Sequence, residues 1–128
     1  MSIKYKKVKQ RVTNAKGQVK EVFFARACQR HKVTLEDVAE HIAGYTSLSR
    51  GDVYSVLIAL SDTIPDYLLD NNTVELGDLG IFSLHFNSQS EEAEEKVTWR
   101  SIQELKIRFR PGKRIKDRLK FPSFKLAK

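Results

Sequence analysis

Residues 74–86 alternate between apolar and polar positions, with one break at residues 77–80, which read Gly-Asp-Leu-Gly. After the break Phe82, Leu84 and Phe86 occupy every second position. A period of two is typical of strands that bury one face. Glycine adopts positive φ without steric penalty, so the break is suited to a tight turn. The pattern predicts a β-hairpin with one apolar face, which needs cover from other elements to be stable.

A second alternating stretch lies near the C-terminal end, at residues 105–110, and carries charge on one side. Pro111-Gly112 stops this strand, and the apolar residues Ile115 and Leu119 then follow helical spacing within a basic segment. A sheet with apolar residues on one face and basic groups on the other indicates a polyanionic partner. The apolar positions are Leu105, Ile107 and Phe109, and the basic positions between them are Lys106, Arg108 and Arg110.

Two helices are predicted before the hairpin. Residues 34–37, Thr-Leu-Glu-Asp, form a capping box that starts the first helix, and Gly44 ends it. Ser49 starts the second helix, whose wide apolar face continues to Leu68. Pro65 lies inside this pattern and is expected to kink or split the helix, because proline removes one donor and crowds the preceding turn. Helices followed by strands predict the α+β class.

The charge is unevenly distributed along the 128 residues, a length typical of one domain. The net charge is +7 and the pI is about 9.6. Residues 1–32 contain ten Lys and Arg against one acid, residues 33–104 three against fourteen, and residues 105–128 ten against one. The net charges of these segments are therefore +9, −11 and +9. Basic ends favour nucleic acid or another anionic surface as partner.

At two of these stretches, VELGDLGIFSL and RFRPGKRIKDRL, the chain resembles the HU family of bacterial histone-like DNA-binding proteins. The first corresponds to the family's hairpin and the second to its final strand and basic C-terminal helix. The resemblance covers residues 34–120 and implies an HU-like α+β fold: two N-terminal helices, an antiparallel sheet with an arm at residues 87–104, and a short C-terminal helix. Residues 1–33 are then an additional β-hairpin, and residues 121–128 a tail that docks on the body or adds an edge strand.

The resemblance further implies a non-enzymatic nucleoid protein that binds double-stranded DNA as a homodimer, largely without sequence specificity. It places Arg108 and Arg110 on the saddle that cups the duplex, with Lys113, Arg114 and Lys116 beside it. Arginine suits this role because its planar fork binds phosphate oxygens bidentately. A solvated basic face is the alternative interpretation of these residues. The predicted shared core of the dimer consists of Val38, Ile42, Val56, Leu57 and Leu60 on the helices and Phe82, Phe86 and Phe109 beneath the sheet.

The arm departs from the family pattern. In HU proteins this segment is basic and has a proline near its tip that wedges between base pairs, the general device of minor-groove bending proteins. Here it lacks proline and carries Glu91, Glu92, Glu94 and Glu95, which repel phosphates. Trp99 with Val97 is expected to pack against the domain, with a wedge or stacking role as the alternative. The acidic arm and the extra hairpin also favour a second function, an HU-like domain used as a protein-interaction or scaffold module.

The first hairpin turns at residues 14–17, Asn-Ala-Lys-Gly, and its second strand spans residues 19–28. The strand contains β-branched and aromatic residues, so we expect burial of at least one face. Its role has two interpretations. Either an added edge hairpin carries lysines that keep the edge soluble, or these lysines extend a DNA surface.

Signals for other chemistry are weak. The spacing gives none of His31, His41 and His85 a nucleophile or carboxylate partner, and Cys28 with His31 falls short of the four ligands of a structural zinc site. We therefore expect no enzyme, cofactor, metal or small-molecule substrate. A single cysteine cannot form an internal disulfide, the N-terminus lacks an apolar signal segment, and no stretch is long and apolar enough for a membrane helix. These features predict a soluble intracellular protein, and the HU resemblance implies a place at the nucleoid of the bacterial cytoplasm.

Overall fold

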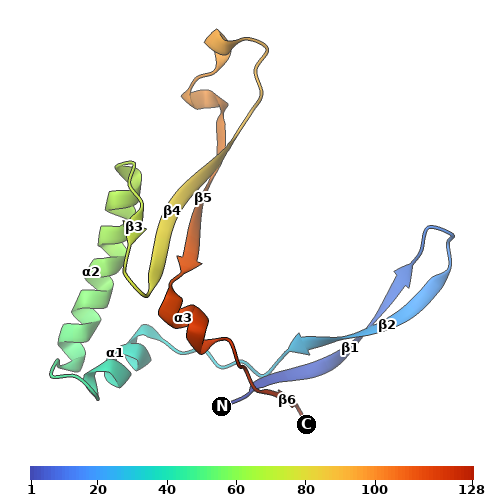
Figure 1. Ribbon diagram of the computed structural model, residues 1–128, viewed down its shortest axis with the longest axis horizontal. Coiled ribbons are helices and arrows are strands. Elements are labelled where there is room, and N and C mark those ends of the chain that lie inside the picture. Colours follow the sequence, from blue (N-terminus) through green and yellow to red (C-terminus); the bar gives the residue numbers. More distant parts are fainter. The chain divides into compact units, whose positions relative to one another are not determined.

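The computed structural model describes all residues, 1–128, and shows an α+β chain with three helices and two three-stranded sheets. The chain divides into two compact units (Figure 1). The helical unit, as we term it, comprises Thr34–Arg118. The strand unit comprises Met1–Val33 together with Leu119–Lys128, so it is assembled from both ends of the chain.

Both predicted helix starts are confirmed. Helix α1 spans Leu35–Ala43, and its capping box is complete. The Thr34 hydroxyl accepts a hydrogen bond from the Asp37 amide at 3.3 Å, and the Asp37 carboxylate accepts one from the Thr34 amide at 2.9 Å. Helix α2 spans Arg50–Leu69, and the Ser49 hydroxyl accepts a bond from the Asp52 amide at 3.1 Å. Each cap pairs amides that the helix itself leaves without partners.

Helix α2 continues through Pro65, so of the two expected outcomes, a kink or a split, the split is wrong. Proline removes a single backbone donor, whereas the surrounding turns keep theirs. Packing holds the helix on both sides of the proline, because Val53 before it and Leu68 after it are buried. The sequence pattern could not weigh this packing against the local cost of proline.

The sheet of the helical unit contains β3 (Val74–Glu75), β4 (Gly80–Ser88) and β5 (Ile102–Pro111), in the order β3-β4-β5. The turn between β3 and β4 uses positive φ at Gly77 (56°) and Gly80 (147°), as the sequence predicted. In the antiparallel register Phe82 lies opposite Phe109, and their ring centroids are 4.8 Å apart. The hairpin therefore has one apolar face, and α2 lies against β3 and β4.

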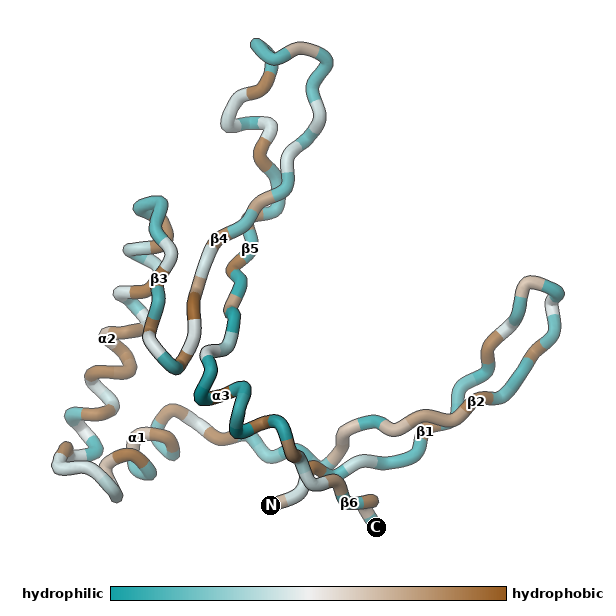
Figure 2. The backbone as a smooth tube through the Cα atoms, viewed as in Figure 1, coloured by the Kyte–Doolittle hydropathy of each residue, from teal (hydrophilic) through white to brown (hydrophobic).

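A single chain covers little of its apolar surface. Ala39, Val53 and Leu68 are the only buried hydrophobic residues, although apolar residues run along α1 and α2 (Figure 2). Val56 is 61% exposed and Phe109 is 45% exposed. An uncovered apolar face of this kind marks a surface that another layer would stabilise.

The arm continues β4 and β5 and extends away from the helices, as Figure 1 shows. A β-bulge marks its base, where the register shifts between His85 and Asn87 and Glu104 adopts a φ of 51°. Beyond the strands lie two short 3₁₀ helices, η1 (Glu94–Lys96) and η2 (Trp99–Ser101).

The expectation that Val97 and Trp99 pack against the domain is wrong. Val97 is 55% exposed and Trp99 is 75% exposed. The arm carries both residues away from the helices, and the side chain that is buried at the tip of the arm is a polar one. Ser101 is the buried residue of the tip, and its hydroxyl donates to the Glu91 carboxylate at 3.0 Å.

The strand unit forms a second sheet from β1 (Ile3–Thr13), β2 (Val19–Ala27) and β6 (Phe124–Leu126), in the order β2-β1-β6. The additional hairpin is confirmed, with Gly17 at a φ of 77° in its turn. The tail adds an edge strand, because β6 pairs in parallel with β1. The expected burial of β2 is wrong, since Phe23 is 69% exposed. The reason is that this sheet is a single layer and no other element of its unit covers it.

Candidate nucleic-acid interface

Arg108 and Arg110 lie on the face of the sheet opposite to the apolar one. The register places Arg108 across from Ser83 and Arg110 across from Ile81, whereas Phe109 lies across from Phe82. Successive residues of a strand point to opposite faces, so the two arginines share one face. Both are exposed and form no ion pair. Two guanidinium groups are therefore available to an anion on this face.

Lys106 belongs to the same face, because it lies across from His85. The alternation along β5 signalled this position, yet the predicted site did not include it. Its ammonium group is 3.3 Å from the Glu104 carboxylate, so part of its charge is already compensated. Lys106 therefore extends the row of basic side chains toward the arm but attracts an anion less than the two arginines do.

Helix α3 (Lys113–Arg118) starts against the β3–β4 turn. The Gly112 amide donates to the Leu79 carbonyl at 3.0 Å, and a Cβ atom at Gly112 would overlap the carbonyl group of Asp78. Only glycine allows the chain to approach this closely. This junction fixes the start of α3 beside the end of β5, and so brings the predicted site residues of the helix, Lys113, Arg114 and Lys116, next to the basic strand.

One of the predicted site residues has a carboxylate neighbour. The Arg114 Nε atom is 3.7 Å from the Asp78 Oδ2 atom, and the two side chains are 77% and 63% exposed. An exposed pair of this kind contributes about 0–1 kcal/mol, so a phosphate can compete for the arginine. Lys113 and Lys116 form no ion pair. Contact between any of these residues and DNA stays a prediction.

His85 has a hydroxyl partner, which the spacing argument failed to anticipate. Its Nε2 atom is 3.0 Å from the Ser83 Oγ atom on the same exposed face. A serine activated for catalysis also requires a group that orients the imidazole, and here no carboxylate contacts His85. The contact thus lacks the third member of such a triad. No group of three or more His, Cys, Asp or Glu side chains is arranged so that it could hold a metal ion. No helix has the length and apolar character to cross a membrane.

The arm presents a mixed surface. The Lys96 Nζ atom is 3.9 Å from a Glu92 carboxylate oxygen, and the Arg100 guanidinium lies over the Trp99 ring at 5.2 Å. Both basic groups of the tip are therefore engaged within the arm. The remaining carboxylates leave it with net negative charge, which opposes phosphate binding.

Comparisons with known proteins bear on the family and the fold of the chain. Residues 1–125 match a family model described as an HU domain fused to a winged helix-turn-helix, Ig or glycine-rich motif. Among solved structures, the crystal structure of a "putative bacterial DNA binding protein" from Bacteroides vulgatus ATCC 8482 is similar, with a TM-score of 0.64 and 12% sequence identity. The match covers 98% of this chain and 48% of that protein, so this chain spans about half its length. At this identity the likeness shows the fold. No curated protein gives a significant sequence match.

Proposed function

This chain belongs to the family of HU domains fused to a winged helix-turn-helix, Ig or glycine-rich motif, and on that premise we propose that it binds double-stranded DNA. The observation that carries the proposal is the basic face of β5. Arg108 and Arg110 alternate on it, are exposed and lack carboxylate partners, while the opposite face is apolar. The family and the DNA-binding description of the similar structure support the same partner.

Binding of this kind acts on the phosphate backbone. Arginine forks donate paired hydrogen bonds to phosphate oxygens, and the lysines of α3 add point charges beside them. Phosphates are present at every step of the duplex, so these contacts carry no sequence information directly. We therefore expect non-enzymatic binding that is largely independent of sequence, as in a protein that coats the bacterial nucleoid.

The apolar surface supports a homodimer. Val56, Phe86, Ile107 and Phe109 are between 45% and 62% exposed in the single chain. A second copy placed symmetrically would cover the same patch on both protomers, which is the usual arrangement of a twofold dimer. The two basic faces would then contribute to one longer saddle. The arm makes no phosphate contact in this proposal, because its glutamates repel DNA.

The test is a fluorescence anisotropy titration of a short labelled duplex at three salt concentrations. For Arg108→Ala with Arg110→Ala, we expect weaker binding and a slope of log affinity against log salt that is smaller by about 1.8 per protomer, because each phosphate contact contributes about 0.9. The matched control removes the same charge from the arm, as Lys96→Ala with Arg100→Ala, and should leave the slope unchanged. Two duplexes of unrelated sequence should respond equally. Wild-type affinity in the Arg108 and Arg110 variant would rule out this face as the DNA surface.

A second function has its own supporting observation. The helical unit contains ten Lys and Arg against fifteen acids, a net charge of −5, and its arm is acidic. Such a surface favours a protein-interaction or scaffold role for the HU-like domain. Retention on heparin or DNA resin at moderate salt discriminates the two, because a scaffold role does not require it.

A further inference from the structure

The strand unit carries the entire positive charge excess of the protein. It contains thirteen Lys and Arg against one acid, a net charge of +12, whereas the helical unit has −5. Pairing of β6 with β1 produces this concentration, because it joins the basic N-terminal and C-terminal segments in one sheet. A sheet with so much charge of one sign attracts polyanions strongly.

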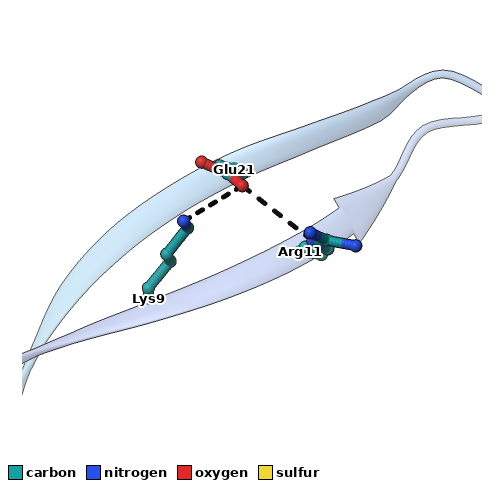
Figure 3. Close-up of polar contacts among 3 residues, drawn as sticks. All are labelled: Lys9, Arg11 and Glu21. Carbon is teal, nitrogen blue, oxygen red and sulfur yellow. Dashed lines mark ion pairs between the residues drawn. The ribbon is translucent and has the colours of Figure 1, made fainter.

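The two faces of this sheet differ. On one face Ile3, Tyr5 and Phe124 help to line an apolar hollow of about 560 Å³. Further along the same face the Glu21 carboxylate lies 3.1 Å from the Lys9 Nζ atom and 3.9 Å from the Arg11 Nε atom (Figure 3). Lys9 and Arg11 on this face thus share a counter-charge, whereas Lys7, which lies across from Ala25 on the same face, forms no ion pair.

The opposite face has no acid. Lys6 lies directly across from Arg26, and Lys4 across from Lys125, and all four are exposed. We call these four residues the basic sheet face. None of them forms an ion pair, although the Arg26 guanidinium lies over the Phe24 ring at 5.5 Å. Side chains directly across a ladder are about 5 Å apart at Cβ, and like charges there are destabilising. The sheet therefore holds two repulsive pairs that an anionic ligand would relieve.

We propose that the basic sheet face is a second binding surface for the phosphate backbone of duplex DNA, separate from the surface around Arg108 and Arg110. The choice of DNA rests on the proposed function, and the binding site itself rests on the geometry of the strand unit. Duplex DNA presents one negative charge per about 1.7 Å of its axis. The four cations form two adjacent cross-strand rows about 6.6 Å apart, so several of them meet phosphates at once.

An acidic protein segment is a weaker candidate for this face. The most acidic segment of a second copy of this chain would be the arm, and its carboxylates are already in use. Glu92 pairs with Lys96, and Glu91 accepts hydrogen bonds from Ser101 and Gln89. Binding the arm would require these contacts to be given up, whereas duplex DNA supplies dense charge without such a loss.

Two double variants of the full chain test the proposal, with the same charge removed from opposite faces of β1 and its neighbour. Lys6→Gln with Arg26→Gln alters the basic sheet face, and Lys9→Gln with Arg11→Gln alters the face shown in Figure 3. The first should reduce the salt slope by about 1.8 per protomer and the affinity by up to about 60-fold at 0.1 M salt. The control should lose less than half of that slope, even though it leaves Glu21 without a partner.

Unlike the DNA affinity, the fold should be the same in the two double variants as in the wild type. Both pairs are exposed, so circular dichroism should match the wild type in both variants. The Lys6 and Arg26 variant also loses a repulsion, so its melting temperature should equal or slightly exceed that of the wild type. As a second readout, a photo-cross-linking residue at position 6 should form an adduct with the duplex, and one at position 9 should not. Equal slopes in the two double variants, or cross-linking only from position 9, would overturn the proposal.

The variant Arg108→Gln with Arg110→Gln, measured on the same duplex, separates this inference from the proposed function. A reduced slope in both it and the Lys6 and Arg26 variant supports two surfaces. A loss only in the Arg108 and Arg110 variant overturns the second surface and leaves the proposed function standing. A loss only in the Lys6 and Arg26 variant supports the basic sheet face and overturns the saddle assignment. If the Lys6 and Arg26 variant keeps its DNA affinity and changes only its oligomeric state, the face binds protein and the inference fails.

Discussion

Gly112→Ala is expected to destabilise the helical unit by loosening the junction that holds α3. A Cβ atom at this position would overlap the carbonyl oxygen and carbon of Asp78 and lie 3.1 Å from its Cα atom. All three are backbone atoms, so no rotation of a side chain relieves the overlap. Overpacking of this kind destabilises proteins by about 1–3 kcal/mol. Stretching the bond from the Gly112 amide to the Leu79 carbonyl adds about 1 kcal/mol, and we expect a total of about 2–4 kcal/mol.

Urea unfolding followed by circular dichroism measures this change in the free energy of unfolding. The matched control is Gly51→Ala in the first turn of α2, where the nearest atom to an added Cβ is the Ser49 Oγ atom at 4.0 Å. Alanine there should stabilise by about 0.4–1 kcal/mol, because it restricts the unfolded chain without strain. The two substitutions are chemically identical and have opposite expected signs. Equal protomer concentrations are needed, because dimerisation would contribute to the measured stability.

A free energy of unfolding of Gly112→Ala within about 0.5 kcal/mol of the wild-type value, the margin typical of surface substitutions, would refute the expected overlap. A second consequence concerns binding. Displacement of α3 moves Lys113, Arg114 and Lys116 away from β5, so duplex affinity should fall in Gly112→Ala and remain unchanged in Gly51→Ala.

Four further predictions concern the caps, the apolar face and the arm. Thr34→Ala should destabilise by about 1 kcal/mol in urea unfolding, because it removes an N-cap. Hydrogen bonds from the Thr34 amide and hydroxyl hold the pKa of Asp37 below its usual 3.8. The stability that Asp37 contributes is therefore present above about pH 4 and is lost as the pH falls through its folded-state pKa. Asp37→Asn should flatten this acid limb of a curve of unfolding free energy against pH. Val56→Glu should convert a dimer to monomers in light scattering, whereas Ser55→Glu, at an exposed position about 100° around α2 from Val56, should not. Trp99 is the only tryptophan and is 75% exposed, so its fluorescence should stay that of a hydrated indole when DNA is added; strong quenching by DNA would show that the arm binds the duplex.

Much of the helical unit could be predicted from local patterns. The N-caps of α1 and α2, the glycine turn before β4 and the alternation of Arg108 and Arg110 with apolar residues all act over a few residues, and the structure shows each where it was expected. Such features depend on hydrogen bonds and steric limits within one turn or one strand. The assignment of the two arginines to one face needed nothing beyond the period of the strand.

The errors arose where a residue's surroundings come from elsewhere in the chain. The apolar residues of β2 and the side chain of Trp99 were expected to be buried because they are hydrophobic. Hydrophobicity drives burial only where another layer is within reach. A strand pattern does not say whether its sheet has a second layer, and an arm sequence does not say how far the arm extends from the helices. The continuity of α2 across Pro65 has the same origin, because packing on both sides outweighed the local effect of proline.

By itself, the sequence determined the elements, their caps and turns, the α+β class and the basic character of β5. Only the tertiary structure decided which basic residues act together. The N-terminal and C-terminal segments are more than a hundred residues apart in the chain, and no periodicity links them. Hydrogen bonding between β1 and β6 places Lys4 across from Lys125, next to Lys6 and Arg26. Charge along a chain becomes a binding surface only when strand pairing sets the distance and the face of each side chain, because electrostatic attraction depends on spatial separation rather than on sequence separation.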